Sequence, residues 1–398
     1  MLSLILTALI FVISFVLVIS FLVFFHELGH YSVGRFFGVA VERFSIGFGK
    51  PIFRRKAKSG TDWVIGRYPL GGYVKFLGDA GAASNPDAQR LAEIKSELSD
   101  QGQSEKISDV FHFKPVWQRT LIVLAGPIAN FILAIILFAI LALSFGTAEN
   151  ESVVTELTPG GAAEKAGMEI GDHILTLNGK DVSLTNDLIP YVAIRSGAEL
   201  DAIILRDGQE INLTLTPERK ARRDDIGGVN NIGTIGVNVG GREFVRYIDH
   251  GPISALNFGY DQFTGMIATT GSYVGRIFQG KEDGKAFGGP VKIATITGKS
   301  VVDIVNDELT LGQKLRNVFA TLLSLSAAIS IGLGVANLMP IPALDGGHLL
   351  YYGYEAIAGR PLSENKQEIG FRIGFAILVT LLIYFTINDF GYVRSMTS

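Results

Sequence analysis

The chain of 398 residues contains no cysteine. Disulfide bonds are therefore excluded, and so are metal sites built from thiolate ligands. A metal ion in this protein would have to be held by histidine and carboxylate side chains. The sequence has only six histidines, so two of them at a ligand spacing carry information.

Charged residues are also scarce, at 18% of the chain, and the formal net charge is −3. No basic stripe interleaved with aromatic residues is present in the sequence, so nothing favours a nucleic-acid partner. Hydrophobic residues make up 48% of the chain, and glycine is abundant at 47 residues. This composition is typical of a membrane protein rather than of a soluble globule.

Four uncharged windows span or nearly span the length of about 20 apolar residues that a membrane helix needs. They are Leu2–Phe25, Thr120–Phe145, Val318–Leu344 and Ile373–Asn388. The last window is short, and the side chain of Arg372 beside it can reach the interface and so complete the span. A signal peptide is an alternative for the first window, but that window lacks a basic start and a clean cleavage site.

Basic residues predict the orientation of these spans. They follow the first window or immediately precede the second: Arg35, Arg43, Lys50, Arg54, Arg55, Lys56, Lys58 and Arg119. Because loops rich in Lys and Arg stay in the cytoplasm, the first connection is predicted to be cytoplasmic. The N-terminus and the long segment from 146 to about 311 are then outside, and the loop after the third span is inside.

The end of the first window carries the sequence His26-Glu27-Leu28-Gly29-His30. On a helix, residues four apart lie one above the other, so both imidazoles can bind one metal ion while Glu27 lies beside them. Histidine and carboxylate ligands suit zinc, and a catalytic zinc site keeps three protein ligands and one open position. Ionisable residues in or near a membrane span are costly and usually functional. A chance match is the alternative.

A third ligand is expected where the third window ends, in the segment from Asn337 to His348. By the predicted orientation this segment lies at the same membrane face as the two histidines, so Asp345 can reach them. Pro340 and Pro342 break the helix, and irregular backbone at membrane depth is tolerated only inside protein or around a wet cavity. An ordinary Asp-Gly turn is the alternative for Asp345, and His348 is a rival ligand.

The two motifs resemble the signatures of the site-2 protease family, the intramembrane zinc metalloproteases. The closer likeness is to the bacterial regulator of sigma-E protease type, and it covers nearly the whole chain. Other segments that resemble this type are Phe48-Gly49, Pro69–Lys75, Gly126–Asn130 and Gly288–Val291. The resemblance implies one Zn²⁺ per chain, with the ligands His26, His30 and Asp345. It also implies that Glu27 is the general base of a metalloendopeptidase.

Substrate-binding residues are expected around this centre. The resemblance implies that Asn337 contacts the substrate or the active-site backbone. Gly72 and Tyr73 belong to a strand predicted over Gly71–Phe76, with Trp63–Tyr68 as its possible hairpin partner, and the resemblance implies that this membrane-dipping β element binds an unwound substrate. Asn130 needs a partner in the second span, and it is expected either to face the active-site cavity or to pack between helices.

The expected fold is a polytopic α-helical membrane protein with about four spans, a membrane-associated β-hairpin and an inserted extracytoplasmic α+β domain. Residues 1–145 and 312–398 are predicted to form the two halves of the membrane core. Residues 146–241 carry the pattern A-G-x-x-x-G-D-x-I-L-x-L-N-G, which resembles a PDZ domain, in one copy where the resembling type carries two. Residues 242–311 are predicted to form an extracytoplasmic amphipathic linker region.

Local signals predict the smaller elements. A loop or short solvated helix is expected over Asp79–Asp109, and a helix capped by Thr185 is expected to end at Ser196. Strands, turns, hairpins and helices are predicted over Val153–Leu157, Ala162–Ala166, Gly171–Gly179, Leu200–Arg206, Ile211–Leu215, Ile232–Val237 and Ser254–Gly280. The strand Ile232–Val237 is expected either to line a peptide groove or to close the fold.

The predicted function is hydrolysis of a peptide bond within or beside the bilayer. The resemblance implies single-span membrane substrates, such as anti-sigma factors, in regulated intramembrane proteolysis. The PDZ groove is expected to bind an extended peptide or a new terminus. The expected location is the bacterial inner membrane, with the N-terminus and PDZ domain in the periplasm and the active site open toward the cytoplasm. The alternatives are a PDZ membrane scaffold with a relic metal site and a metal transporter, although the chain lacks an internal repeat.

Overall fold

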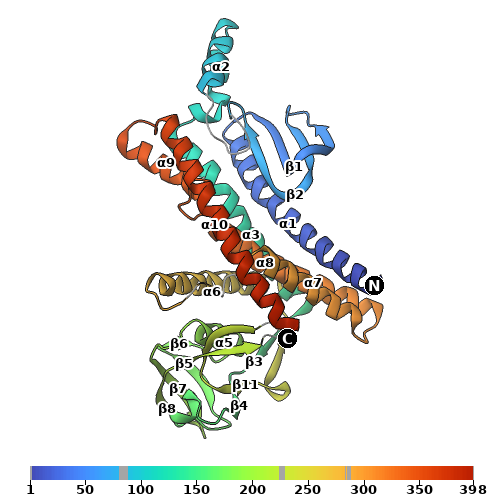
Figure 1. The fold of residues 1–398 in the computed structure, drawn as a ribbon, viewed down its shortest axis with the longest axis vertical. Coiled ribbons are helices and arrows are strands. Elements are labelled where there is room, and N and C mark those ends of the chain that lie inside the picture. The colour runs from blue at the N-terminus through green and yellow to red at the C-terminus, as the bar shows by residue number, and fades with distance from the viewer. Residues whose placement is uncertain (1, 80–87, 224–228, 283, 285–287, 398) are drawn as a thin grey trace. The chain divides into compact units, whose positions relative to one another are not determined.

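A computed structural model describes residues 2–79, 88–223, 229–282, 284 and 288–397. Figure 1 traces these residues as a ribbon. The chain divides into two compact units, each made of two stretches of sequence. The first unit is Met1–Leu137 with Thr297–Tyr384, and the second is Phe138–Ile296 with Phe385–Ser398.

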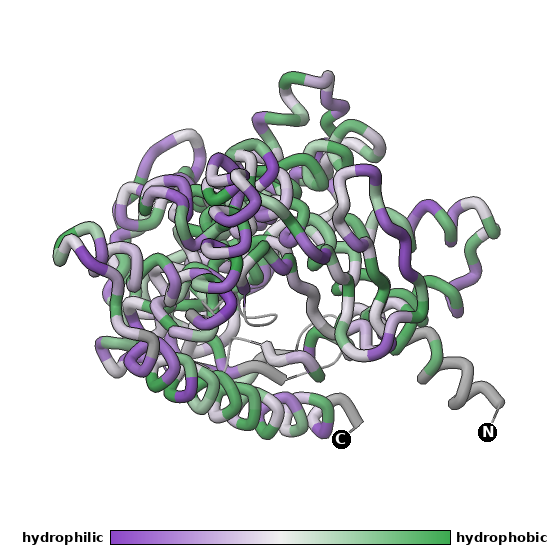
Figure 2. The backbone as a smooth tube through the Cα atoms, turned by 90° about the horizontal axis from the view of Figure 1, so that it is seen from above, coloured by the Kyte–Doolittle hydropathy of each residue, from purple (hydrophilic) through white to green (hydrophobic). Residues whose placement is uncertain are grey.

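Four helices in the described part of the chain are long and apolar enough to cross a bilayer. They are α1 (Leu2–Phe36), α3 (Val116–Phe145), α8 (Leu311–Asn337) and α10 (Glu364–Thr397). Figure 2 shows hydrophobic residues along most of α10, the helix that ends at the C-terminal label. Three of the predicted windows lie wholly within α1, α3 and α10, and the window Val318–Leu344 begins within α8. Helix α10 extends beyond the uncharged window Ile373–Asn388 at both ends, and its additional turns contain charged residues.

The end of α8 differs from the predicted window. The window runs to Leu344, whereas α8 ends at Asn337 and turns follow, because proline cannot donate a helical hydrogen bond. A helix that the sequence analysis did not predict, α9 (Asp345–Ala358), then begins. It starts close to the end of α8: a Cβ atom on Gly346 would lie 2.2 Å from the carbonyl oxygen of Met339. Asp345 is thus fixed as the first residue of a helix.

Two long strands, β1 (Val41–Lys56) and β2 (Asp62–Phe76), form an antiparallel sheet beside α1 (Figure 1). The predicted hairpin between Trp63–Tyr68 and Gly71–Phe76 is wrong, because both segments belong to β2 and both pair with β1. The glycine pair inside β2 bends a continuous strand instead of reversing the chain.

The first segment of β1 has a segment of β2 on each side. Phe44 of β1 lies opposite both Trp63 and Val74 of β2, so Val41–Ile46 runs between the two halves of β2. The segment Gly72–Phe76 pairs with β1 on one side only, among the described residues. It is therefore an edge of the sheet, and its outer backbone groups are not used by a neighbouring strand.

The segment after β2 contains a short helix, as predicted. Helix α2 (Ala88–Asp100) has mostly exposed residues, and the 3₁₀ turns Ser104–Asp109 and Phe111–Phe113 lead from it to α3. Residues 80–87 of the predicted loop lie outside the described residues. Phe111 is fully buried and packs on Phe76, with ring centroids 4.8 Å apart. This contact fastens the end of β2 to the segment that enters α3.

The second unit is rich in short strands. Its main sheet has four antiparallel strands in the order β6-β5-β7-β8, and pairs β3–β12, β4–β11 and β9–β10 accompany it. The strands are β3 (Thr147–Asn150), β4 (Val154–Leu157), β5 (His173–Leu177), β6 (Lys180–Asp181), β7 (Leu200–Arg206), β8 (Gln209–Leu215), β9 (Glu218–Arg223), β10 (Val229–Thr234), β11 (Val237–Val239) and β12 (Val245–Ile248). The helices are α4 (Ala162–Lys165), α5 (Thr185–Ala193), α6 (Pro252–Phe278) and α7 (Pro290–Asn306), the last of which continues into the first unit.

Most predicted elements of this region are confirmed, including both hairpins and the long helix α6, and two details are corrected. Leu184, not Thr185, is the N-cap of α5, and the Thr185 hydroxyl donates instead to the carbonyl of Glu151. The predicted strand Ile232–Val237 is divided between β10 and β11, because Gly236, with φ of 79°, turns the chain between them.

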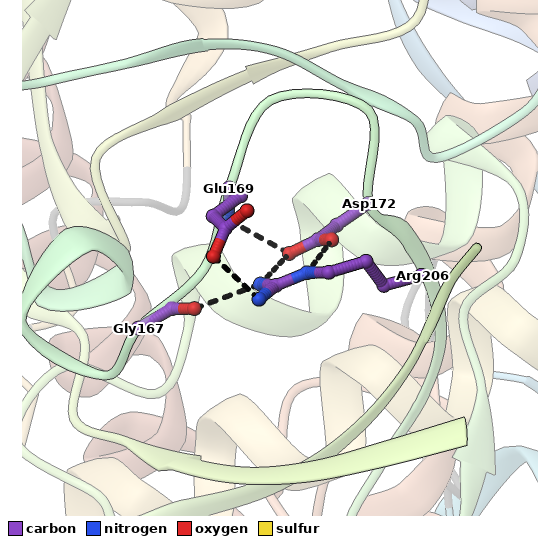
Figure 3. A network of polar contacts seen from close by, with 4 residues as sticks. All are labelled: Gly167, Glu169, Asp172 and Arg206. Carbon is purple, nitrogen blue, oxygen red and sulfur yellow. Dashed lines mark hydrogen bonds and ion pairs between the residues drawn. The ribbon is translucent and has the colours of Figure 1, made fainter. Parts of the chain in front are cut away.

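A buried carboxylate fastens the turn before β5 to the end of β7 (Figure 3). The Arg206 guanidinium donates to both oxygens of Asp172, at 2.7 and 2.8 Å. It also donates to the Glu169 carboxylate and to the carbonyl of Gly167. Asp172 itself is fully buried. Paired charges of this kind are costly to separate, since removal of one partner leaves a buried charge uncompensated.

We expect Arg206→Ala to lower the free energy of unfolding of the strand-rich region, because the change leaves the buried Asp172 carboxylate without its partner. The control is Lys165→Ala, because Lys165 pairs with Glu218 at an exposed site and should have a clearly smaller effect. Pulse proteolysis of the full chain in urea and detergent measures both values. Equal losses in the two variants would contradict this account of the network.

The same pair predicts a pH dependence. Burial would raise the pKa of the Asp172 carboxyl, but the hydrogen bonds from Arg206 and from the Glu169 amide outweigh burial and hold that pKa below its usual value. The stabilisation is therefore present above the unfolded pKa of about 3.9, and it is lost as the pH falls toward the lowered folded pKa. We expect the urea midpoint for unfolding of the strand-rich region to decrease as the pH is lowered from 5 to 3. Asp172→Asn should remove the part of this pH dependence that comes from Asp172.

Candidate metal centre

Three side chains with metal-binding atoms converge in the first unit: His26 and His30 of α1, and Asp345 at the start of α9. The Nε2 atoms of the two histidines lie 3.2 Å apart. The Asp345 Oδ2 atom lies 3.2 Å from Nε2 of His26 and 3.5 Å from Nε2 of His30. Ligands bound tetrahedrally to zinc at 2.0–2.1 Å are separated from one another by about 3.3 Å. The three atoms thus have the spacing of a zinc ligand set.

The electrostatic environment also fits a cation. The side chains of His26, His30 and Asp345 are only 10–17% exposed. Metal binding requires neutral imidazoles. With both imidazole lone pairs turned toward the cluster, Asp345 Oδ2 is a buried oxygen without a hydrogen-bond donor in the described part of the chain. A divalent ion between the three atoms would satisfy all of them, and two imidazoles with one carboxylate are a donor set that zinc prefers.

Helix α3 packs very closely against the two histidines. A Cβ atom on Gly126 of α3 would lie 2.3 Å from Nε2 of His30 and 2.8 Å from Cε1 of His26. A Cβ atom on Gly29 of α1 would lie 2.2 Å from the carbonyl oxygen of Ala125. Any larger residue at either position would need the helices to move apart. Both glycines are therefore required by the close approach of α1 to α3, and this approach places both imidazoles against the α3 backbone.

The outer nitrogens of both imidazoles contact α3. Nδ1 of His30 lies 2.9 Å from the carbonyl oxygen of Ile122, and Nδ1 of His26 lies 3.1 Å from the side-chain amide of Asn130. Both contacts are buried, and Asn130 is fully buried. These partners orient the two rings so that Nε2 of each points into the cluster.

A cavity of about 210 Å³ lies at the cluster. Besides the three cluster residues, it is lined by the predicted site residues Glu27, Gly72, Tyr73 and Asn337. The backbone of Val74 forms a hydrogen bond with the Glu27 carboxylate, and a Cβ atom on Gly72 would lie 3.1 Å from Cγ of Glu27. The structure therefore brings the edge of β2 against Glu27. Asn130 is not among the lining residues.

Other lining residues were not singled out from the sequence. They are Val74, Phe76, Phe111, Val123, Ala343 and Leu344. Val74 and Phe76 lie in the strand predicted over Gly71–Phe76. A prediction that this strand packs against Glu27 would have included them among the lining residues. Phe111 and Val123 reach the cavity through tertiary packing, which no local pattern reveals. His348 also lines the cavity, but it is not part of the cluster of metal-binding atoms.

The close packing of α3 leads to a prediction about metal affinity. We expect Gly126→Ala to displace the His30 ring and to weaken zinc binding by about 10–100-fold, as when the orientation of a ligand is disturbed. Gly332→Ala is the control, because a Cβ atom on Gly332 of α8 would meet no atom of the described residues within 4 Å. Competition with a chelator measures both affinities. Equal zinc affinity in the two variants would contradict the account of the α1–α3 contact.

Comparison with known proteins agrees with the centre. The model of peptidase family M50 matches residues 14–381. The metalloprotease MmpA of Caulobacter vibrioides is 38% identical over 383 residues, which cover 96% of this chain and 95% of that protein. The zinc metalloprotease RasP of Geobacillus kaustophilus is 30% identical over 438 residues, which cover 95% of this chain and 97% of that protein. The chain therefore belongs to peptidase family M50, the site-2 protease family, and is a membrane-embedded zinc metallopeptidase.

Proposed function

We propose that this enzyme is an intramembrane endopeptidase that cleaves single-span membrane proteins, such as anti-sigma factors, in regulated intramembrane proteolysis. The observation that carries the proposal is the position of the metal-binding cluster. His26 and His30 lie on a helix that is long and apolar enough to cross a bilayer, and Glu27 lies beside them in the same cavity. A hydrolytic centre placed within a membrane helix acts on peptide bonds that are themselves within or beside the bilayer.

His26, His30 and Asp345 are the proposed ligands of one zinc ion. The chemistry that a zinc ion bound there supplies is Lewis acidity, which polarises a carbonyl oxygen and lowers the pKa of water. Glu27 is the proposed general base: its carboxylate accepts a proton from the attacking water and later passes that proton to the leaving amine. The hydrogen bond with the Val74 backbone holds the Glu27 carboxylate in place for both transfers.

The edge of β2 is the proposed binding site for the substrate backbone. A peptide bond within an α-helix is shielded, so a substrate span has to be extended before it can be hydrolysed. Gly72 and Tyr73 lie on a segment that, among the described residues, pairs on one side only, and this segment lines the cavity beside Glu27. Strand addition to this edge would hold the extended substrate by backbone hydrogen bonds. Asn337, which also lines the cavity, is proposed to contact the substrate or the adjacent backbone.

The enzyme is proposed to lie in the bacterial inner membrane with several spans. The basic residues after the first span support a cytoplasmic position for the sheet β1–β2 and for the mouth of the active site. The N-terminus and residues 146–241 are then periplasmic, and residues 242–311 form the linker at the outer membrane face. Helix α6 supports this placement, because it exposes Ile253, Leu256, Tyr260 and Phe278, which suit an interface.

Residues 146–241 are proposed to be a PDZ domain that regulates access of the substrate. The order of the elements from β4 to β8 matches the pattern found in the sequence, and the buried core of these elements includes Val154, Leu177, Leu188 and Ile204. We assign the peptide groove to β11, which pairs only with β4 in the described part of the chain. An extended peptide or a new chain terminus would add to the free edge of β11.

The role of Glu27 is tested by Glu27→Gln. This change keeps the shape of the side chain but removes its capacity to accept a proton. We expect the variant to keep one zinc per chain and its thermal stability, and to cleave a tagged single-span model substrate in liposomes at least about 100 times more slowly than the wild type. Cleavage at the wild-type rate would remove Glu27 from the mechanism.

The ligand role of Asp345 is tested by Asp345→Ala. Loss of a residue that hydrogen-bonds to a metal ligand weakens metal binding by roughly 10–100-fold. We expect Asp345→Ala to weaken zinc binding by more than this and to abolish cleavage. His348→Ala is the matched control, because His348 lines the same cavity outside the cluster. Elemental analysis after dialysis against a chelator measures the zinc. If His348→Ala loses the metal and Asp345→Ala retains it, the ligand assignment is wrong.

A further inference from the structure

Asn130 is a fully buried polar residue in the middle of α3, a helix long and apolar enough to cross a bilayer. Its backbone is fixed from α8, since the hydroxyl of Ser330 donates to the carbonyl oxygen of Asn130 at 2.8 Å. Its side-chain amide lies against His26, with the Asn130 Nδ2 atom 3.1 Å from the His26 Nδ1 atom. A buried amide within a membrane helix is costly unless it is used, so this contact indicates a role at the metal centre.

The requirement for a particular partner follows from the protons of the two imidazoles. A neutral imidazole carries one N–H and one lone pair, and the lone pair binds metal. In His30, Nδ1 lies 2.9 Å from the carbonyl oxygen of Ile122, which can only accept a hydrogen bond. Nδ1 of His30 therefore carries the proton, and its Nε2 presents a lone pair to the cluster. For Nε2 of His26 to do the same, Nδ1 of His26 must also carry a proton and must meet an acceptor.

Asn130 can supply that acceptor if its amide oxygen faces the ring. The Nδ2 atom lies toward His26, and the buried Oδ1 atom has no hydrogen-bond partner among the described residues. A rotation of the amide by 180° exchanges these two atoms within the same space. In either orientation, one polar atom of the amide has no hydrogen-bond partner among the described residues. The orientation therefore depends on which nitrogen of His26 carries the proton. With Nδ2 donating to Nδ1, the His26 proton would lie on Nε2 and would block metal binding.

We propose that Asn130 is a positioning residue of the zinc site, whose Oδ1 atom accepts the Nδ1–H of His26 and so turns the Nε2 lone pair toward the metal. This proposal rests on the zinc ligands proposed above. It makes α3 the element that orients both histidines, His26 through a side-chain amide and His30 through the Ile122 carbonyl. It also accounts for the absence of Asn130 from the cavity lining, since its amide is directed at a ligand instead of at the substrate.

The experiment compares two replacements of Asn130 in the full-length Glu27→Gln protein, so that zinc affinity is measured without proteolysis. Asn130→Asp has nearly the same shape and only acceptor atoms toward the ring, as in the carboxylate–histidine–zinc arrangement of many metalloproteins. Asn130→Leu also has a similar size, but it has no acceptor. The probe is Zn²⁺ titrated against a competing chelator in detergent, and thermal unfolding of the zinc-free proteins reports on their folding.

We expect Asn130→Leu to bind zinc about 10–100-fold more weakly than its parent, and Asn130→Asp to bind within about threefold of the parent or more tightly. An Asn130→Leu protein with the zinc affinity of its parent would overturn the proposal. So would an Asn130→Asp protein that is folded and yet more than tenfold weaker, because the amide nitrogen would then be the group that matters. If Asn130→Leu does not fold, the comparison of Asn130→Asp with its parent still decides.

These results separate the proposal from the zinc site on which it rests. A parent protein that binds one zinc, together with variants that bind it equally well, would retain the ligands His26, His30 and Asp345 but remove the role of Asn130. A parent protein that binds no zinc would overturn the ligand assignment and the positioning role together. A purely structural role for Asn130 would lower the stability of both zinc-free variants and would not distinguish the acceptor from the aliphatic side chain.

Discussion

The contact between α1 and α3 is the constraint on which the metal centre depends. Gly29 and Gly126 let the two helix backbones approach so closely that a single Cβ atom at either position would overlap the other helix or a histidine ring. Both imidazoles are thereby pressed against α3, and their outer nitrogens meet groups of that helix. The rings lose the freedom to turn away from each other. The two histidines, which we propose as zinc ligands, are thus held in a fixed arrangement because a second helix limits the rotamers of both.

The third cluster residue is brought to the site by a different device. The prolines after α8 end that helix, and the glycines after Asp345 allow α9 to begin directly beside the end of α8. The C-terminal part of α9 is fastened to α3 as well, because Glu355 accepts a hydrogen bond of 2.6 Å from Arg119. The same helix α3 therefore holds the two histidines and anchors the element that starts with Asp345. This arrangement explains how residues more than 300 positions apart in the chain share one cavity.

The three residues of the candidate metal cluster could be singled out from the sequence because two of them are four residues apart in one motif. The motif from His26 to His30 needs only a helix, and the predicted orientation of the spans leads to the expectation that Asp345 lies near it, where the structure has it. Strand pairing is different. The alternation of apolar and polar residues predicts that Gly71–Phe76 is a strand, but not which strand it joins. This strand pairs with Phe44 and the neighbouring residues of β1, because these residues provide the surface against which its side chains are buried. The contact of Asn130 with His26 likewise depends on helix packing across 104 positions, for which the sequence contains no local signal.

The most direct test of this account is the location of zinc by anomalous scattering at the zinc K-edge, from crystals of the Glu27→Gln protein prepared with one equivalent of Zn²⁺. The account predicts one anomalous peak per chain, about 2.0–2.2 Å from Nε2 of His26, Nε2 of His30 and a carboxylate oxygen of Asp345. A peak bound by His348 or His112 instead, or a protein that retains no zinc under these conditions, would contradict it.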